Sequence, residues 1–168
     1  MSGPDQIAAA NRARALGHEL MRVHDWLRTE LKRLRNEIDT YIDDAVAPAS
    51  LLQAHCVAFC SSLTQHHTSE DATTFPLLAK QLPQLAPVLD ELRKDHRLVE
   101  SILHRLRHLL TSVTPETVES ARRETDGLTA ILESHFQWEE RKLVDALNGL
   151  DTARTIEIDE LFGVDVPL

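Results

Sequence analysis

Histidines recur along this chain at places where helical hydrophobic patterns would carry apolar residues. One lies in each of four successive patterns, at His24, His66, His96 and His135. Two of them are followed four residues later by a glutamate, as His66-x-x-x-Glu70 and His135-x-x-x-Glu139. Residues four apart share one face of an α-helix, so each pair can bind one ion or two adjacent ions. Four imidazoles and two carboxylates facing one interior are the ligand set of a dinuclear metal site in a helical bundle.

A single inward-facing histidine is more often a hydrogen-bonded core residue than a ligand. That explanation fails for the whole set, because burying unpaired imidazoles and carboxylates costs several kcal/mol per charge and a cation would offset these costs together. A set of six or seven ligands is too large for a tetrahedral zinc site. Mixed imidazole and carboxylate ligation favours iron, with manganese less favoured, and we predict two metal ions.

Four amphipathic segments position these residues. Apolar residues repeat at spacings of three and four over residues 7–39, 52–77, 89–110 and 121–150, which is the period of helices with one buried face. Breaks at Pro48, between Gln81 and Pro87, and at the cap Thr114-Pro115 leave short connections, and Pro76 should kink or end the second helix. Short connections between long helices imply antiparallel neighbours. We predict an all-α fold, an up-down-up-down antiparallel four-helix bundle.

The length of 168 residues suits one domain. We assign residues 1–150 to the bundle and residues 151–168 to a C-terminal extension that docks on one end of it. The formal net charge of −9 and the lack of a Lys/Arg cluster argue against nucleic acid or an anionic membrane as partner. No apolar run is long enough to cross a membrane, and the first residues lack the features of a signal peptide. We therefore expect a cytoplasmic protein in which Cys56 and Cys60 are reduced and packed.

The motifs around these histidines are similar to those of a known family. They are Val23-His24-Asp25, His66-His67-Thr68-Ser69-Glu70-Asp71 with Phe75-Pro76, Asp95-His96-Arg97, and His135-Phe136-Gln137-Trp138-Glu139-Glu140. Together they resemble the hemerythrin-like (hemerythrin HHE cation-binding domain) family over roughly residues 16 to 147. The resemblance implies a non-haem di-iron centre in which Glu70 and Glu139 bridge two iron ions (Fe²⁺/Fe³⁺) that also share an oxo or hydroxo bridge.

Two departures from the family's oxygen carriers leave alternatives open. Those carriers place the bridging carboxylate five residues after the histidine, which would select Glu140, whereas the i+4 spacing selects Glu139. They also hold a second histidine one turn after the third-helix ligand, where this chain has Glu100. If Glu100 binds, the added negative charge favours ferric iron and redox turnover. If it lies on the surface, an iron position stays open to water, peroxide or nitric oxide.

Other histidines are not predicted to be ligands. His104 and His108 drift from the apolar stripe into a basic, solvated face. His55 lies about 16 Å along the helix axis from His66, too far to share an ion. His67 is one residue away from the direction of His66, so we expect it at the surface or in a role that supports the ligands.

The function expected from this reasoning is binding, sensing or scavenging of O2 or of related small oxidants such as NO or peroxide. The alternatives are an enzyme of the di-iron oxidase or peroxidase type, or an iron sensor that is stable only when it holds metal. Family-level analogy does not choose among them. The sequence also leaves open whether the chain is a monomer or a homodimer.

Overall fold

The computed structural model describes residues 3–43, 48–150, 158–164 and 166, and every element in these ranges is helical. The elements are α1 (Pro4–Asp43), α2 (Ala49–Ser69), a π-helix (Glu70–Thr74), α3 (Phe75–Gln81), a 3₁₀-helix (Pro83–Leu85), α4 (Ala86–Leu109), α5 (Pro115–Asn148) and α6 (Ile158–Phe162). The predicted all-α fold class is confirmed. None of the described helices combines the length and the apolar character needed to cross a lipid bilayer.

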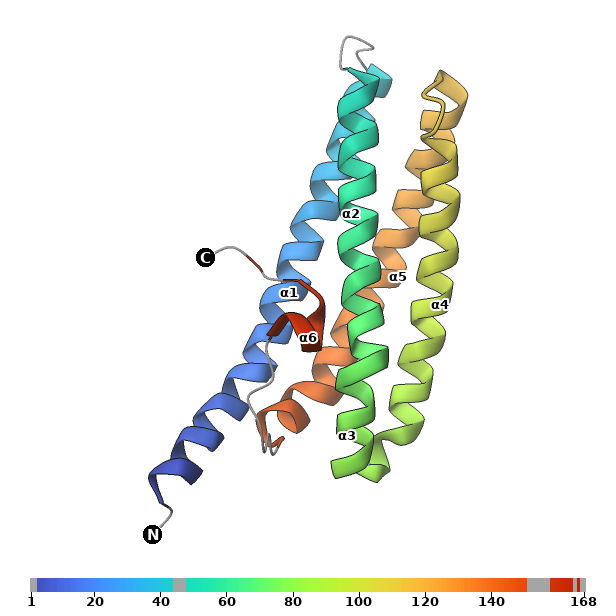
Figure 1. Cartoon of the computed structure of the whole chain (residues 1–168). Helices are drawn as coiled ribbons and strands as arrows, with labels where there is room; N and C mark the ends of the chain where they lie inside the picture. The colour runs from blue at the N-terminus through green and yellow to red at the C-terminus, as the bar shows by residue number, and fades with distance from the viewer. Residues whose placement is uncertain (1–2, 44–47, 151–157, 165, 167–168) are drawn as a thin grey trace.

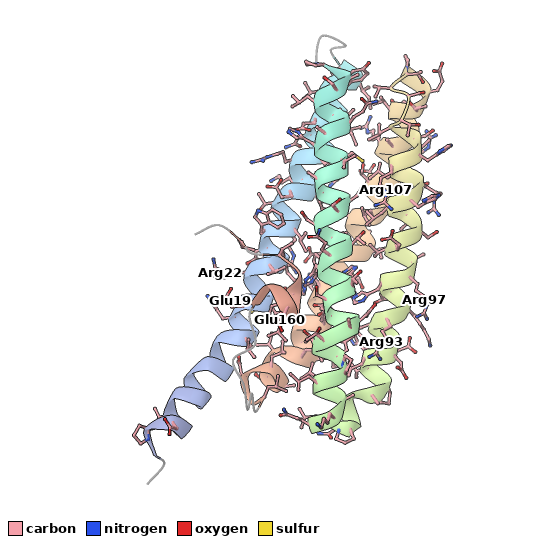
Figure 2. The ribbon with its side chains drawn as sticks, in the orientation of Figure 1. Glu19, Arg22, Arg93, Arg97, Arg107 and Glu160 are labelled. Carbon is pink, nitrogen blue, oxygen red and sulfur yellow. The ribbon has the colours of Figure 1, made fainter. Side chains whose placement is uncertain are left out.

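Four long helices lie side by side and enclose the core (Figure 1). The chain rises along α1, descends through α2 and α3, rises along α4 and descends along α5. α1 contacts α2 and α5, and α4 contacts the same two helices, so the four close a ring. Charged side chains such as Glu19 and Arg22 of α1 and Arg97 of α4 reach outward (Figure 2).

The predicted apolar stripes form the core because each helix turns one face inward. In α1 the buried stripe consists of Leu16, Leu20, Val23, Leu27, Leu31, Leu34 and Ile38. The predicted start of α5 is also confirmed, because the Thr114 hydroxyl accepts a hydrogen bond from the backbone N–H of Thr117 at 3.2 Å and Pro115 occupies the first turn. Cys56 and Cys60 are buried free thiols, with their sulfur atoms 3.8 Å apart, as predicted.

A π-helix lies where the sequence predicted a kink. Pro76 has no N–H to donate, and its ring would clash with the carbonyl four residues earlier in a regular α-helix. The chain therefore widens over Glu70–Thr74, and the N–H of Phe75 bonds the carbonyl of Glu70, five residues back. Such single π-turns often occur at functional sites, and this one begins at a candidate metal ligand.

The C-terminal segment packs on the bundle, but not on an end of it as the sequence led us to expect. α6 contacts α2, the π-helix and α1 (Figure 1), and Leu161 and Phe162 are fully buried. The physical reason is that α2 and the π-helix present side-chain donors to the carbonyls of Leu161 and Phe162 on this lateral face. The predicted boundary near residue 150 adjoins residues 151–157, which lie outside the described residues.

Candidate metal centre

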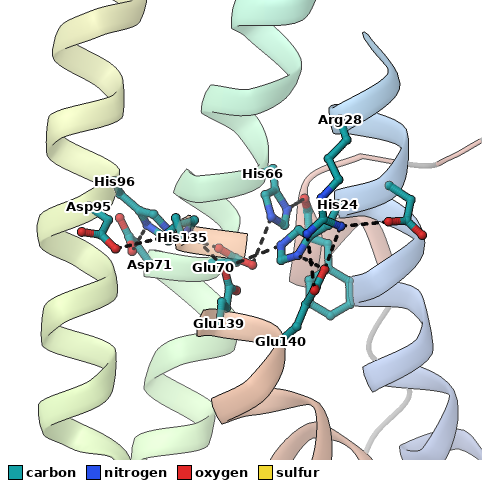
Figure 3. Close-up of polar contacts among 12 residues, drawn as sticks. His24, Arg28, His66, Glu70, Asp71, Asp95, His96, His135, Glu139 and Glu140 are labelled. Atoms are coloured by element: carbon teal, nitrogen blue, oxygen red, sulfur yellow. Dashed lines mark hydrogen bonds and ion pairs between the residues drawn. The ribbon is translucent and has the colours of Figure 1, made fainter. Parts of the chain in front are cut away.

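Five imidazoles and two carboxylates converge in the interior of the bundle. They belong to His24 of α1, His66 and His67 of α2, Glu70 of the π-helix, His96 of α4, and His135 and Glu139 of α5. The exposed fraction of each residue is 5% or less. Figure 3 shows the carboxylates of Glu70 and Glu139 lying between the imidazoles. All six residues predicted as principal ligands are thus brought to one place, and His67 joins them.

The atoms that face one another here lack hydrogen-bond partners. They are the Nε2 atoms of His24, His66, His67, His96 and His135 and both carboxylate oxygens of Glu70 and of Glu139, all buried and unpartnered among the residues that the structure describes. Their mutual contacts fall at ion-pair distances, such as 3.2 Å from His66 Nε2 to Glu70 Oε1, but do not form hydrogen bonds. Because orphaned buried polar atoms are costly, this donor set fits a bound cation.

The donors divide into two groups that share the carboxylates. His67, His96 and His135 lie together on one side, and His24, His66 and Glu70 lie together on the other. Glu70, His96 and Glu139 form a third set that links the two sides, and within each set the donor atoms lie within 4.8 Å of one another. Glu70 Oε1 lies 3.2 Å from His66 Nε2, while its Oε2 lies 3.3 Å from His96 Nε2. Glu139 Oε2 lies 3.1 Å from His135 Nε2 and 3.6 Å from His24 Nε2. Each carboxylate therefore touches both groups.

Four of the histidines are held through their second ring nitrogen. The Nδ1 atoms of His24, His96 and His135 lie 3.0, 2.8 and 3.1 Å from carboxylate oxygens of Glu140, Asp71 and Asp95, respectively. His66 Nδ1 lies 2.8 Å from the carbonyl oxygen of Phe162. Since these oxygens can only accept, Nδ1 carries the proton and Nε2 of a neutral ring keeps its lone pair for a metal. Metal-binding histidines typically have such partners.

Burial and mutual repulsion set the charges of the metal-free centre. Burial, followed by repulsion from His24, lowers the pKa of His66 to about 3. Burial, reinforced by His96 and His66, holds the pKa of His67 well below its usual range. Both rings are therefore neutral and able to bind a cation. Burial, followed by the nearby charge of Glu139, raises the pKa of Glu70 well above its usual range, so this carboxyl is protonated.

Glu139 and His135 form an ionised pair in the metal-free centre. Burial opposes the ionisation of Glu139, but His24 and His135 outweigh it and lower the pKa of Glu139 well below its usual range. Burial also opposes the charging of His135, but its hydrogen bond to Asp95 and the nearby charge of Glu139 outweigh it and raise the pKa of His135 to about 9. At neutral pH the His135 imidazolium of the metal-free centre therefore lies beside the Glu139 carboxylate.

The expectation that His67 could lie at the surface is wrong, because its side chain is buried. Its ring stacks on that of His96, with centroids 3.8 Å apart, and its Nε2 faces the three-imidazole group. A signal existed in the sequence, because Cys60, Leu63, His67 and Glu70 repeat at spacings of three and four, and all four are buried. The buried face of α2 is therefore wide enough to carry both His66 and His67.

The two open alternatives lie outside the converging donors. Glu100 Oε2 accepts a hydrogen bond from the Thr64 hydroxyl at 2.8 Å, and its Oε1 accepts one from Arg107 at 3.0 Å. Glu140 accepts hydrogen bonds from His24 and Arg28, both at 3.0 Å. The carboxylate of Glu139, by contrast, lies among the imidazole Nε2 atoms (Figure 3).

Replacing His67 with alanine is expected to weaken metal binding at the three-imidazole group, whereas Glu100→Ala should leave it nearly unchanged. The loss should exceed about 10-fold, which is already typical for residues that only support a ligand. Competition between each variant and a coloured chelator for Co²⁺ would measure the affinity, with circular dichroism as the folding control. Equal losses in the two variants would contradict the placement of these side chains.

Metal affinity is expected to rise with pH while the stability of the metal-free protein falls. His135 and Glu70 are both protonated in the metal-free centre at neutral pH, so metal uptake must release these protons. Affinity should rise about 10-fold per pH unit for each proton released. Since the folded-state pKa of His135 is raised to about 9, its stabilising contribution is complete below about pH 6.5 and disappears as pH rises through about 9.

Calorimetric titration of anaerobic Fe²⁺ in buffers of different ionisation enthalpy would measure the protons released. Chemical denaturation of the metal-free protein from pH 6 to 9 would measure the opposing trend. Metal affinity that does not change over this range would show that neither group carries a proton before binding.

Comparison with known proteins agrees with this geometry. The family model of the hemerythrin HHE cation-binding domain matches residues 16–147, a span that includes all seven converging residues. Neither a search of curated proteins nor one of solved structures gave a match. The resemblance identified from the histidine motifs is confirmed, and the chain belongs to the hemerythrin HHE cation-binding domain family.

Proposed function

We propose that this chain is a non-haem di-iron protein, built as an up-down-up-down four-helix bundle, that binds O2 or related small oxidants such as NO or peroxide. The observation that carries this proposal is the convergence of five unpartnered imidazole nitrogens and two shared carboxylates in a buried space. Mixed imidazole and carboxylate ligation with bridging carboxylates favours iron. The family match to a cation-binding domain supports the same conclusion.

The arrangement of donors supports a specific assignment. His67, His96 and His135 would hold one iron ion, His24 and His66 would hold the other, and Glu70 and Glu139 would bridge them. When bound, iron would supply the electrons that a small oxidant needs in order to bind. The two-imidazole position has the smaller set of protein donors, so it is the position with room for an external ligand.

The surroundings of the two-imidazole position favour a small, neutral ligand. Phe136 stacks on His24 with ring centroids 4.1 Å apart, and the ring of Phe162 lies 6.4 Å from that of His66. His24 and His66 have no exposed surface. Such buried, apolar walls suit a small and weakly hydrated molecule. This supports binding of a diatomic molecule over oxidation of a polar organic substrate.

A peroxidase-type enzyme is the second candidate, and one observation favours it. A cavity of about 210 Å³ between α2 and α4 is lined by polar side chains, among them His67, Asp71, His96 and Glu100. This cavity reaches the three-imidazole group from solvent. Hydrogen peroxide can form hydrogen bonds with such a lining, which O2 does poorly.

Metal analysis and a visible spectrum would test the proposal. We expect two irons per chain after anaerobic reconstitution, and a reversible charge-transfer band when air is admitted and then removed. Rapid passage to the ferric state with repeated consumption of peroxide would support the enzyme instead. A protein that binds no transition metal after reconstitution would overturn both.

A further inference from the structure

We propose that residues 158–164 form a wall of the metal centre that positions His66, so that docking of this segment and metal binding stabilise each other. The inference rests on the proposed function, because it concerns the two-imidazole position. It assigns a role to the C-terminal segment. The contact between His66 and Phe162 joins this segment to α2 across 96 residues of the chain.

The first contact that supports this proposal is made by His66 itself. Its Nδ1 lies 2.8 Å from the Phe162 carbonyl oxygen, which can only accept, so His66 must donate. This places the ring proton on Nδ1 and the lone pair on Nε2, toward Glu70. The other clamped histidines use side-chain carboxylates of Asp71, Asp95 and Glu140 for the same purpose. His66 alone among these four depends on the backbone of the C-terminal segment.

A second contact attaches the same segment to the turn that carries Glu70. The hydroxyl of Thr74, in the π-helix, donates to the Leu161 carbonyl oxygen at 2.7 Å. Thr74 is 1% exposed, and Leu161 and Phe162 are 0% exposed. Two consecutive carbonyls of the segment are therefore satisfied by two donors from the ligand-bearing stretch of α2 and the π-helix. Loss of docking would leave both donors without these acceptors.

Gly163 permits this close approach. Its φ of +74° lies in the left-handed region that favours glycine, and a Cβ built there would lie 2.2 Å from the carbonyl oxygen of Gln65 and 2.8 Å from the Ser69 hydroxyl. The clash with the Gln65 oxygen involves backbone, so it cannot be relieved by rotating a side chain. Docking of the segment against α2 therefore requires glycine at position 163.

These contacts couple the segment to the metal. A cation on Nε2 polarises the imidazole and strengthens the Nδ1–H donor, so the bond to Phe162 becomes stronger when metal binds. Thermodynamic linkage is reciprocal. If bound metal raises the equilibrium constant for docking by some factor, docking raises the metal-binding constant by the same factor. Docking also covers the His66 side of the centre with the fully buried Phe162 ring.

Gly163→Ala tests the proposal, with Gly127→Ala as the matched control because a Cβ at Gly127 meets no atom within 4 Å. We expect Gly163→Ala to lower iron affinity at the two-imidazole position 10- to 100-fold, the range typical for loss of a ligand's hydrogen-bond partner. At an iron concentration that just fills both positions of the wild type, the iron bound by Gly163→Ala should fall from two toward one per chain. Thr74→Val, which removes only the second contact, should act in the same direction more weakly.

Two further readouts separate positioning from general stability. Hydrogen exchange of residues 158–164 in the wild type should slow when iron is added, and in Gly163→Ala it should be fast in either state. Nitrogen-15 NMR of the metal-free proteins should show the Nδ1-protonated form of His66 in the wild type and a mixture of tautomers in Gly163→Ala.

Rapid exchange of the segment in Gly163→Ala together with wild-type iron content and an unchanged His66 tautomer would overturn the proposal. So would exchange in the wild type that iron does not alter. If the wild type itself took up no iron, the proposed function would fail, and the tautomer comparison would still decide whether the segment positions His66.

Discussion

Replacement of Glu70 by glutamine is expected to abolish iron binding at both positions while leaving the metal-free fold intact. The two oxygens of Glu70 face different imidazole groups, at 3.2 Å from His66 and 3.3 Å from His96. An amide can offer only one oxygen, and its NH2 group would point at a cation on the other side. The loss should exceed about 100-fold, since even residues behind a ligand contribute 10- to 100-fold.

The metal-free protein should tolerate Glu70→Gln because burial and the charge of Glu139 raise the pKa of Glu70, so the native side chain is already neutral there. Glutamine has the same size and charge as this protonated acid. Iron analysis after reconstitution, together with denaturation of the metal-free proteins, would measure both effects. The matched control is Glu37→Gln, a partly buried glutamate that pairs with His55. Retention of one iron by Glu70→Gln would show that the carboxylate is not shared.

Iron is expected to raise the thermal unfolding midpoint by roughly 8 to 16 °C relative to the metal-free protein. At free iron about 1,000 times the dissociation constant, binding to the folded state alone adds about 4 kcal/mol of stability. For a chain of this length each kcal/mol shifts the midpoint by about 2–4 °C. The physical source is the set of buried donor atoms at the centre that lack partners without a cation.

Differential scanning calorimetry with and without a chelator would measure the shift under anaerobic conditions. Glu70→Gln serves as the control, because a variant that binds no iron should unfold at the same temperature in both samples. Equal midpoints for the wild type would mean that its buried donors are stabilised in another way. Loss of helical structure on chelation at room temperature would instead favour the iron-sensor alternative, in which only the metal-bound fold is stable.

Much of the fold and of the donor set could be predicted because helical periodicity is a local property. Residues spaced by three and four must share a face, and a face rich in leucine must be buried. His24, His66, His96 and His135 stand in such stripes, and each is at most 4% exposed. The same reasoning placed Glu70 and Glu139 one turn after a histidine. Local chemistry also predicted the cap at Thr114 and a disruption at Pro76.

What the sequence could not decide depends on how wide the interior is and how each helix is rotated about its axis. His67 joins the donors because the rings of His96 on α4 and His135 on α5 reach that edge of α2. A one-dimensional stripe does not show the width of a buried face. Glu100 is held away from the donors by Thr64 on α2 and by Arg107 two turns further on. The choice between Glu139 and Glu140 likewise depends on the rotation of α5 against α1, which places Glu140 on the far side of His24.

By itself, the sequence determined an all-helical chain with at least one inward histidine in each long segment, because the 3.6-residue period of a helix is set by residues only a few turns apart. Only the tertiary structure decided which donors meet, how they divide into two groups, and that Phe162 closes one side. Those outcomes are set by contacts between segments as distant as residues 66 and 162. Packing of whole helices determines such contacts, since no local pattern carries information about a partner so far along the chain.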